Sequence, residues 1–249
     1  RIMNASIDIN CDMGEGCGDD AALMPFISSA NIACGYHAGD ASTMYSTIEL
    51  AAKHGVAVGA HPSYRDRENF GRTDVELSPN EIRTLILEQL ELFAAACREV
   101  GVTMGHVKPH GALYNRSARD LVVARSIAEA VREFDPNLNL YGLAQSHSTE
   151  AARSLGLKAA DEAFADRAYE PDGSLVSRTK PNALINSPEI AAAQALRIAL
   201  GGGVVAVDGS NVPLSAETIC VHGDGPNAVA IARTIRSAFE LAGVAIMAP

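Results

Sequence analysis

The sequence lacks the features that would place this chain in a membrane or on nucleic acid. No apolar run in its 249 residues approaches the roughly 20 residues that span a bilayer. The 20 Lys and Arg side chains are outnumbered by 30 Asp and Glu side chains and form no cluster along the sequence. A phosphate backbone or an anionic membrane surface needs a clustered positive face. We therefore expect neither nucleic acid nor a membrane as a partner.

Cysteine is also scarce. The five cysteines are an odd number and none of them forms a C-x-x-C pair, so we expect no disulfide framework. No signal peptide precedes the first predicted strand, and we expect a cytoplasmic protein.

Nucleotide-binding motifs are missing as well. The chain has no G-x-x-x-x-G-K-[ST] sequence and therefore no P-loop for ATP. The glycine-rich segment 14–18 follows a predicted strand, but the third glycine of a dinucleotide fingerprint would fall at Asp19. The turn 223–226, before a predicted helix, could still accept a single phosphate.

Short apolar runs alternate with segments of helical period, a pattern typical of βα units that build a parallel sheet. Strands are predicted at 6–10, 30–34, 56–61, 105–108, 138–144, 158–164, 204–207 and 218–222. Helices are predicted at 20–27, 42–54, between Ser78 and Gly101, and at 118–134, 148–155, 188–200 and 227–242. With about seven or eight βα units and no long linker, we predict one α/β domain over residues 1–249, a distorted (β/α) TIM-like barrel. An open doubly wound sheet is the alternative.

Polar side chains recur at the carboxyl ends of the predicted strands. Strands buried on both faces are normally continuous apolar runs, and the strand ends of a parallel barrel meet at one rim. The residues concerned are Asp8, Asn10, Asp12, Glu15, His37, Asp40, His61, Arg65, Arg67, Arg72, His106, Lys108, His110, His222 and Asp224. The two-residue spacing of His106, Lys108 and His110 points them the same way along a strand.

Each of these residues also has a structural explanation. A single histidine in a strand is often a hydrogen-bonded core residue, and Asp20, Asp40 and Asp224 could be helix caps. Cys11, Cys34 and Cys220 fit small buried side chains, and the arginines of segment 65–72 fit a solvated face. Independent caps and core histidines would not all fall at the same ends of successive strands, which favours a functional site.

Carboxylates, imidazoles and one lysine in a cavity supply acids and bases for proton transfer. A buried lysine requires a partner, so Lys108 should meet Asp8, Asp12 or Glu15, and could hold an oxyanion or a phosphate. Histidine with aspartate also suits a divalent metal, which the spacing alone neither establishes nor identifies.

Five motifs give the chain a resemblance to a known family. They are DINCDMGEG, NIACGYHAGD, GAHPSYRDRENFGR, HVKPHGALYN and the loop ADRAYEPDGSLVSR at 165–178. Together they resemble the LamB/YcsF family, which contains the A subunit of bacterial ATP-dependent 5-oxoprolinase. The resemblance implies a distorted barrel related to the glycoside hydrolase and polysaccharide deacetylase type. It also implies opening of the lactam ring of 5-oxo-L-proline to L-glutamate with ATP hydrolysis, in complex with subunits B and C that handle ATP.

The site residues follow from the strand ends and the resemblance together. The expected catalytic residues are Asp12, Glu15, His37, His61, Lys108 and His110. The expected substrate-binding residues are Asn10, Asp40, Arg72 and Arg178. The expected substrate is 5-oxoproline or its phosphorylated form. Two alternatives stay open, a metal-dependent deacetylase or amidohydrolase and a non-catalytic subunit that binds the lactam.

Overall fold

A parallel barrel forms the centre of the computed structural model, which describes residues 6–17, 19–225 and 227–249. Within these residues the barrel strands are β1 (Ser6–Met13), β2 (Ser29–Ala33), β3 (Ala57–His61), β4 (Met104–Val107), β5 (Asn139–Leu143), β6 (Lys158–Phe164) and β9 (Thr218–Val221). The sheet closes because β9 pairs with both β6 and β1. The predicted barrel class is therefore confirmed, and the open doubly wound sheet is excluded.

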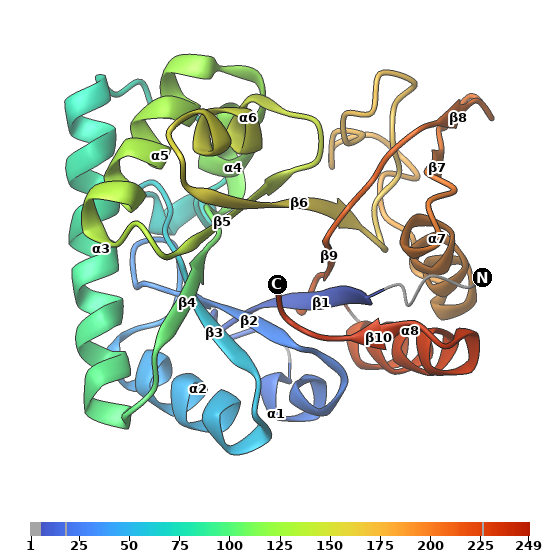
Figure 1. Ribbon diagram of the computed structural model, residues 1–249, viewed down its shortest axis with the longest axis horizontal. Helices are drawn as coiled ribbons and strands as arrows, with labels where there is room; N and C mark the ends of the chain where they lie inside the picture. Colours follow the sequence, from blue (N-terminus) through green and yellow to red (C-terminus); the bar gives the residue numbers. More distant parts are fainter. Residues whose placement is uncertain (1–5, 18, 226) are drawn as a thin grey trace.

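Helices surround the strands, as the ribbon view shows (Figure 1). They are α1 (Asp20–Leu23), α2 (Ala41–His54), α3 (Pro79–Val100), α4 (Gly111–Arg119), α5 (Leu121–Phe134), α6 (His147–Ser154), α7 (Pro188–Ala199) and α8 (Ala228–Ala242). Two 3₁₀ turns, Met24–Phe26 and Arg67–Asn69, lie in loops. The helices bury apolar faces that join the strand side chains in one hydrophobic core.

The helix predicted between Ser78 and Gly101 is confirmed as α3. Ser78 accepts from the backbone N–H of Glu81 while the Glu81 carboxylate accepts from the backbone N–H of Ser78, a reciprocal cap. Gly101 ends the helix in the left-handed conformation.

The structure differs from the predicted elements in several places. The helix predicted at 118–134 is two helices, because Asp120 ends α4 and its side chain accepts from the first backbone N–H groups of α5. The strand predicted at 204–207 is the short β7 (Val204–Val205), which pairs antiparallel with β8 (Asn211–Val212) outside the barrel. The short β10 (Ala245–Ile246), which pairs with the start of β1, was not predicted. Pro226, in the predicted turn before the last helix, lies outside the described residues.

The barrel interior is polar along much of its length. Asp8 on β1 accepts hydrogen bonds from the hydroxyls of Ser28, Ser29, Thr218 and Tyr141. Burial raises the pKa of Asp8, although the hydroxyl hydrogen bonds oppose that shift. The strands therefore carry an internal hydrogen-bonded column that leads to the rim.

His106 lies in this column and not at the rim. It is buried, its Nε2 lies 2.8 Å from Asn31 Oδ1, and its ring stacks on Tyr141 at a centroid distance of 4.3 Å. Gly59 makes room for the ring, because a Cβ at position 59 would lie 2.2 Å from His106 Cδ2. Of the three residues with two-residue spacing, His106 is therefore structural.

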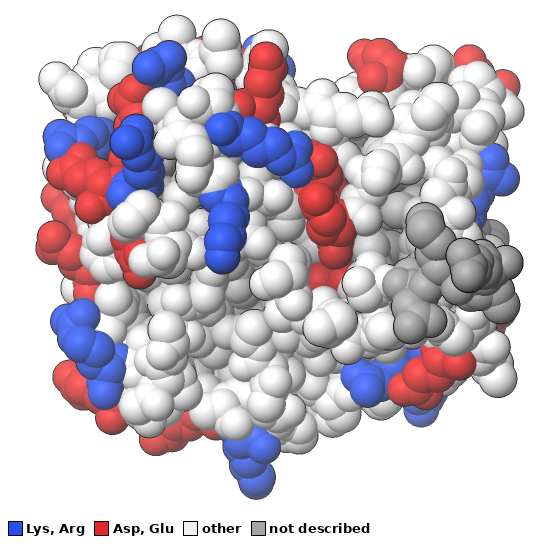
Figure 2. Space-filling model, viewed as in Figure 1, with Lys and Arg blue, Asp and Glu red and all other residues white. Residues whose placement is uncertain are grey.

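The surface is consistent with the expected absence of nucleic-acid and membrane partners, which stays a prediction. On the face drawn in Figure 2, Lys and Arg side chains are interspersed with Asp and Glu side chains, so the described residues of this face form no broad positive patch. Among the described residues, no helix has the length and apolar character needed to cross a membrane.

Candidate functional site

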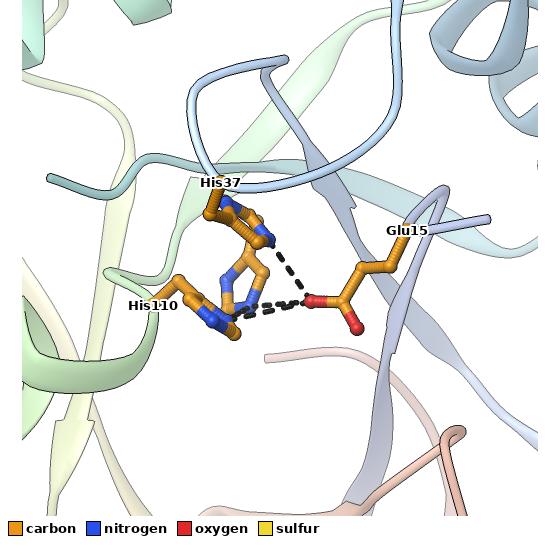
Figure 3. Close-up of side chains that lie close together, drawn as sticks. Glu15, His37 and His110 are labelled. Atoms are coloured by element: carbon orange, nitrogen blue, oxygen red, sulfur yellow. Dashed lines mark hydrogen bonds and ion pairs between the residues drawn. The ribbon is translucent and has the colours of Figure 1, made fainter. Parts of the chain in front are cut away.

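Three histidines and one glutamate meet at the rim of the barrel. His61 ends β3, His37 follows β2, His110 precedes α4 and Glu15 follows β1. Glu15 Oε1 lies 3.0 Å from His37 Nε2, 3.4 Å from His110 Nδ1 and 3.9 Å from His61 Nε2. Figure 3 shows the Glu15 carboxylate directed at the His37 and His110 rings. The structure thus brings together four of the six predicted catalytic residues in direct contact.

Backbone carbonyls fix the orientation of two of these imidazoles. His61 Nδ1 lies 2.7 Å from the carbonyl oxygen of Lys108, and His110 Nε2 lies 2.9 Å from that of Phe70. A carbonyl oxygen only accepts, so both of these nitrogens carry the hydrogen. The other nitrogens, His61 Nε2 and His110 Nδ1, face each other at 2.9 Å.

A hydroxyl orients the third imidazole. Ser63 Oγ donates to the carbonyl oxygen of Tyr64 at 2.9 Å, so it accepts at 3.0 Å from Nδ1 of His37. His37 Nε2 is consequently the nitrogen directed at Glu15. The rings of His37 and His110 also stack, with centroids 3.8 Å apart.

Lys108 lies just below these residues and pairs with Asp12, as predicted. Its Nζ is 2.9 Å from Asp12 Oδ1, 2.8 Å from Glu162 Oε1, 3.1 Å from Asn10 Oδ1 and 3.1 Å from Cys220 Sγ. Although burial opposes the charge, Asp12, Cys220 and Glu162 raise the pKa of Lys108 well above its usual value. Three N–H groups thus face four protein acceptors, and the ammonium is fully engaged inside the barrel.

The two carboxyl groups of the site, Asp12 and Glu15, have pKa values shifted in opposite directions. Burial alone would raise the pKa of Asp12, but His61 and Lys108 lower it well below the usual value, so Asp12 is ionised. Burial and the nearby Asp12 carboxylate raise the pKa of Glu15 to about 7. Glu15 is therefore the carboxyl group whose proton exchanges near neutral pH.

The pKa values of the three imidazoles are also shifted in different directions. Burial and neighbouring His61 lower the pKa of His37 to about 2, and burial lowers the pKa of His110 well below its usual value. Burial alone would lower the pKa of His61, but Asp12 at 3.5 Å raises it. His37 and His110 are thus neutral imidazoles.

The predicted substrate-binding residues do not lie together. Asn10 is buried behind Asp12, where its amide is bonded to protein groups such as Asn31. Asp40 caps α2 by accepting from the backbone N–H of Thr43. Only Arg72 and Arg178 are near each other, because their guanidinium groups lie 2.9 Å and 3.8 Å from Asp224 Oδ2.

Sequence reasoning missed three polar residues of the site. Glu162 lies inside β6 and pairs with Lys108, and Asn31 inside β2 donates to Asp12. Asp166, two residues after β6, accepts from His222 Nδ1 at 2.8 Å. The rule that singled out polar residues in or after buried strands applies to all three, so the signal was present.

The donor atoms form two groups compatible with a metal ion. One atom each from Glu15, His37, His61 and His110 lies within 4.8 Å of the others, and the same holds for Asp12, Cys220 and His222. In the second group the Lys108 ammonium already lies 3.1 Å from Cys220 Sγ and 2.9 Å from Asp12 Oδ1, which disfavours a further cation there. The histidine group is the better candidate.

The fold and the site together define a closed parallel α/β barrel whose strand ends carry an imidazole and carboxylate centre suited to proton transfer. The chain belongs to the LamB/YcsF family, whose family model matches residues 7–249. The resemblance seen in the sequence motifs is thereby confirmed.

One solved structure supports this family assignment, and two others support the fold. The crystal structure of the lactam utilization protein from Thermus thermophilus is 44% identical, covers 98% of this chain and 100% of its own, and has a TM-score of 0.92. A protein from Enterococcus faecalis is 11% identical over 98% of this chain and 97% of its own, with a TM-score of 0.56. The T48 deacetylase is 14% identical over 98% and 88%, with a TM-score of 0.51. The last two share the fold alone.

Proposed function

We propose that this chain is the lactam-opening A subunit of an ATP-dependent 5-oxoprolinase, which converts 5-oxo-L-proline to L-glutamate. The family and the 44% identity to a protein named for lactam utilization support a lactam as substrate. The observation that carries the chemistry is the contact of Glu15 with three imidazoles at the barrel rim.

Ring opening requires one group that takes a proton from water and one that gives a proton to the ring nitrogen. Glu15 suits both steps, because its pKa of about 7 lets it accept and return a proton at neutral pH. His61 stands beside it as a second proton carrier. Asp12, which stays ionised, orients His61 and stabilises its positive charge.

Lys108 has a positioning role in this proposal. Its ammonium is occupied by protein acceptors, so it holds Asp12 ionised and does not bind the substrate oxyanion directly. Arg72 and Arg178 lie at the rim near Asp224, and they are the candidates for the substrate carboxylate or a phosphate. Asp40, which was predicted to bind substrate, has no such role in this proposal because its side chain caps α2.

ATP belongs to partner subunits B and C in this proposal, because the sequence has no P-loop. The partners transfer the γ-phosphoryl group of ATP to the lactam oxygen, which releases ADP. Water then adds to the activated ring carbon in this chain, the C–N bond breaks, and the ring nitrogen takes up protons. The resulting acyl phosphate is hydrolysed by a second water to glutamate and phosphate.

Reconstitution tests the proposal. Glutamate formation from 5-oxoproline and ATP is measured with this chain alone, with candidate B and C subunits alone, and with the mixture. We expect glutamate only in the mixture, with one ADP formed per glutamate. Activity of this chain alone without ATP would instead support an independent amidohydrolase, and a mixture without activity would exclude 5-oxoproline as the substrate.

The alternative of a non-catalytic lactam-binding subunit has its own signature. In that case variants of Glu15 would weaken binding of 5-oxoproline to the complex, while the rate at saturating substrate would stay the same. The proposed acid–base role predicts the reverse, a lower kcat with little change in KM.

A further inference from the structure

The three rim histidines direct their inner nitrogens toward a single region. The outer N–H groups of His61 and His110 are bonded to carbonyl oxygens, and that of His37 is bonded to a hydroxyl oxygen. When all three imidazoles are neutral, each carries its single hydrogen on the outer nitrogen, so the inner nitrogens then hold lone pairs. Outer N–H groups bonded to fixed acceptors are the usual surroundings of metal-binding histidines.

The spacing of the inner donor atoms fits one small ion. Ligands at about 2.0–2.2 Å from an ion lie about 3.3–3.6 Å from one another in a tetrahedral site. His61 Nε2 and His110 Nδ1 are 2.9 Å apart, and His37 Nε2 and Glu15 Oε1 are 3.0 Å apart. All four donor atoms fall within 4.8 Å of one another. A shared ion would need these separations to become equal at the tetrahedral value.

The charges around this centre also favour a cation. Side chains of His37 and His61 are almost fully buried, and a buried dication is costly unless carboxylates compensate its charge. Asp12 Oδ2 lies 3.5 Å from His61 Nε2, and Glu15 Oε1 lies within 3.9 Å of all three inner nitrogens. Asp12 and Glu15 therefore place carboxylate oxygens beside the centre, which favours a cation there.

We propose that His37, His61 and His110 bind one divalent transition-metal ion, with Glu15 beside the fourth, exchangeable position. Three imidazoles favour zinc and its neighbours such as cobalt over magnesium or calcium, which prefer oxygen ligands. Three protein nitrogens with one exchangeable position are the pattern of a catalytic zinc site.

This inference deepens the proposed function, because the ion would lie where water must be activated. There the ion would supply a Lewis acid for the attacking water, and Glu15 would be the carboxyl group beside that water. The existence of the metal site, however, depends only on the histidine geometry and can be measured without any assay of lactam opening.

Metal content and cobalt binding provide the test. The purified chain is treated with a chelator, dialysed and titrated with Co²⁺, while the visible absorption of the bound ion is recorded. We expect about one ion per chain, displaced by Zn²⁺. His61→Gln and His110→Gln should each weaken binding by about 100-fold or more, since each removes a ligand.

Two variants serve as matched controls. His106→Gln changes a buried histidine outside the cluster and His147→Gln an exposed one, so both should bind one Co²⁺ as the wild type does. Far-UV circular dichroism confirms that each variant is folded.

A wild-type chain that binds no Co²⁺ or Zn²⁺ at millimolar concentration would overturn the inference, as would unchanged binding by the His61 and His110 variants. These outcomes are separate from the fate of the proposed function. If the chain binds the ion but the reconstituted mixture forms no glutamate, the metal site is supported and the 5-oxoproline assignment is wrong. If the mixture forms glutamate but binds no metal, the 5-oxoproline assignment is supported and the metal site is wrong.

Discussion

Glu15 is the residue on which the proposed chemistry depends. Gln has nearly the same shape but no proton to exchange, so Glu15→Gln should lower kcat of the reconstituted complex by about 10²–10⁴-fold with little effect on KM. Glu150→Gln, at an exposed position on α6, is the control and should retain full activity. If the Glu15 variant kept the wild-type kcat, the acid–base assignment would be wrong.

Lys108 should stabilise the folded chain, because its ammonium pairs with two carboxylates inside the barrel. Lys108→Met leaves the carboxylates of Asp12 and Glu162 without their counter-charge, so the free energy of unfolding should fall by about 3–5 kcal/mol. Urea unfolding measures this loss. Lys158→Met, at an exposed position, should change it little, and adding Glu162→Gln to the Lys108 variant should restore part of it. A Lys108 variant as stable as the wild type would contradict the burial of this charge.

His106 should make the stability of the fold depend on pH. Burial lowers the pKa of His106 to about 3, whereas an unfolded histidine has a pKa of about 6.5. Between these values the unfolded chain binds more protons, so stability falls as the pH falls below about 6.5, by about 1.4 kcal/mol per pH unit for each such histidine. His37 adds to the same trend.

The measurement is the free energy of unfolding in urea from about pH 7 to about pH 5. His106→Gln should show a smaller pH slope than the wild type, whatever its stability at pH 7. The exposed His147→Gln should keep the wild-type slope. Equal slopes in all three proteins would show that His106 is not held neutral.

At the scale of elements, the loop between β3 and α3 shapes the site. Gly71 in this loop has φ 66°, and a Cβ there would lie 2.9 Å from His37 Cβ and 3.0 Å from His110 Cδ2. Gly55, which ends α2, has φ 68° but would place its Cβ in open space. The two glycines therefore share the backbone requirement and differ only in their contact with the site.

Gly71→Ala and Gly55→Ala should both destabilise the fold by about 1 kcal/mol, because L-residues disfavour positive φ. Only Gly71→Ala should displace the imidazoles, and a shift of about 1 Å costs about 10²-fold in rate. Comparing kcat in the reconstituted complex with thermal unfolding separates the two effects. Equal kcat values for the two variants would show that the loop does not position the histidines.

Elements with strong local signals were predictable from the sequence. The cap at Ser78 and the glycine at 101 fix α3 through contacts within a few residues. The break at Asp120 was missed because apolar spacing continues on both sides of it, and only the cap shows that two helices exist. The segment 204–207 is apolar enough for a barrel strand, but its antiparallel partner at 211–212 takes it out of the barrel.

The sequence predicted which residues gather at the strand ends, but not how far inside the barrel each of them lies. The strand-end rule found the four residues that meet at the rim, since parallel strands bring their carboxyl ends together. The same rule does not distinguish a residue inside the barrel from one at its rim. His106 was therefore grouped with His110, although His106 is hydrogen-bonded to Asn31 in the barrel interior. The pairing of Lys108 with Glu162 depends on barrel closure, which no local pattern records.

At the scale of the whole molecule, closure of the barrel joins the beginning of the chain to its last third. Asp8 on β1 is in register with Thr218 on β9, and Thr218 is in register with Glu162 on β6. The Thr218 hydroxyl donates to Asp8 Oδ2 at 2.6 Å and accepts from Asn10 Nδ2 at 2.6 Å. One buried hydroxyl therefore completes the internal hydrogen bonds at the seam that closes the ring.

Thr218→Val keeps the shape of the side chain and removes these two hydrogen bonds. Because buried polar groups of Asp8 and Asn10 then lose a partner, the free energy of unfolding should fall by about 1–3 kcal/mol. Thr234→Val is the control, since its hydroxyl only donates to the carbonyl oxygen of Ala230 on its own helix. Its loss should be smaller.

The seam variant also tests whether the ring unfolds as a unit. Because β9 is bonded to both β1 and β6, weakening the seam should lower the urea midpoint for secondary structure and for the environment of the six tyrosines together. Circular dichroism and tyrosine fluorescence report these two properties. Separate midpoints would mean that the strands before and after the seam unfold independently, and that closure through Thr218 does not couple them.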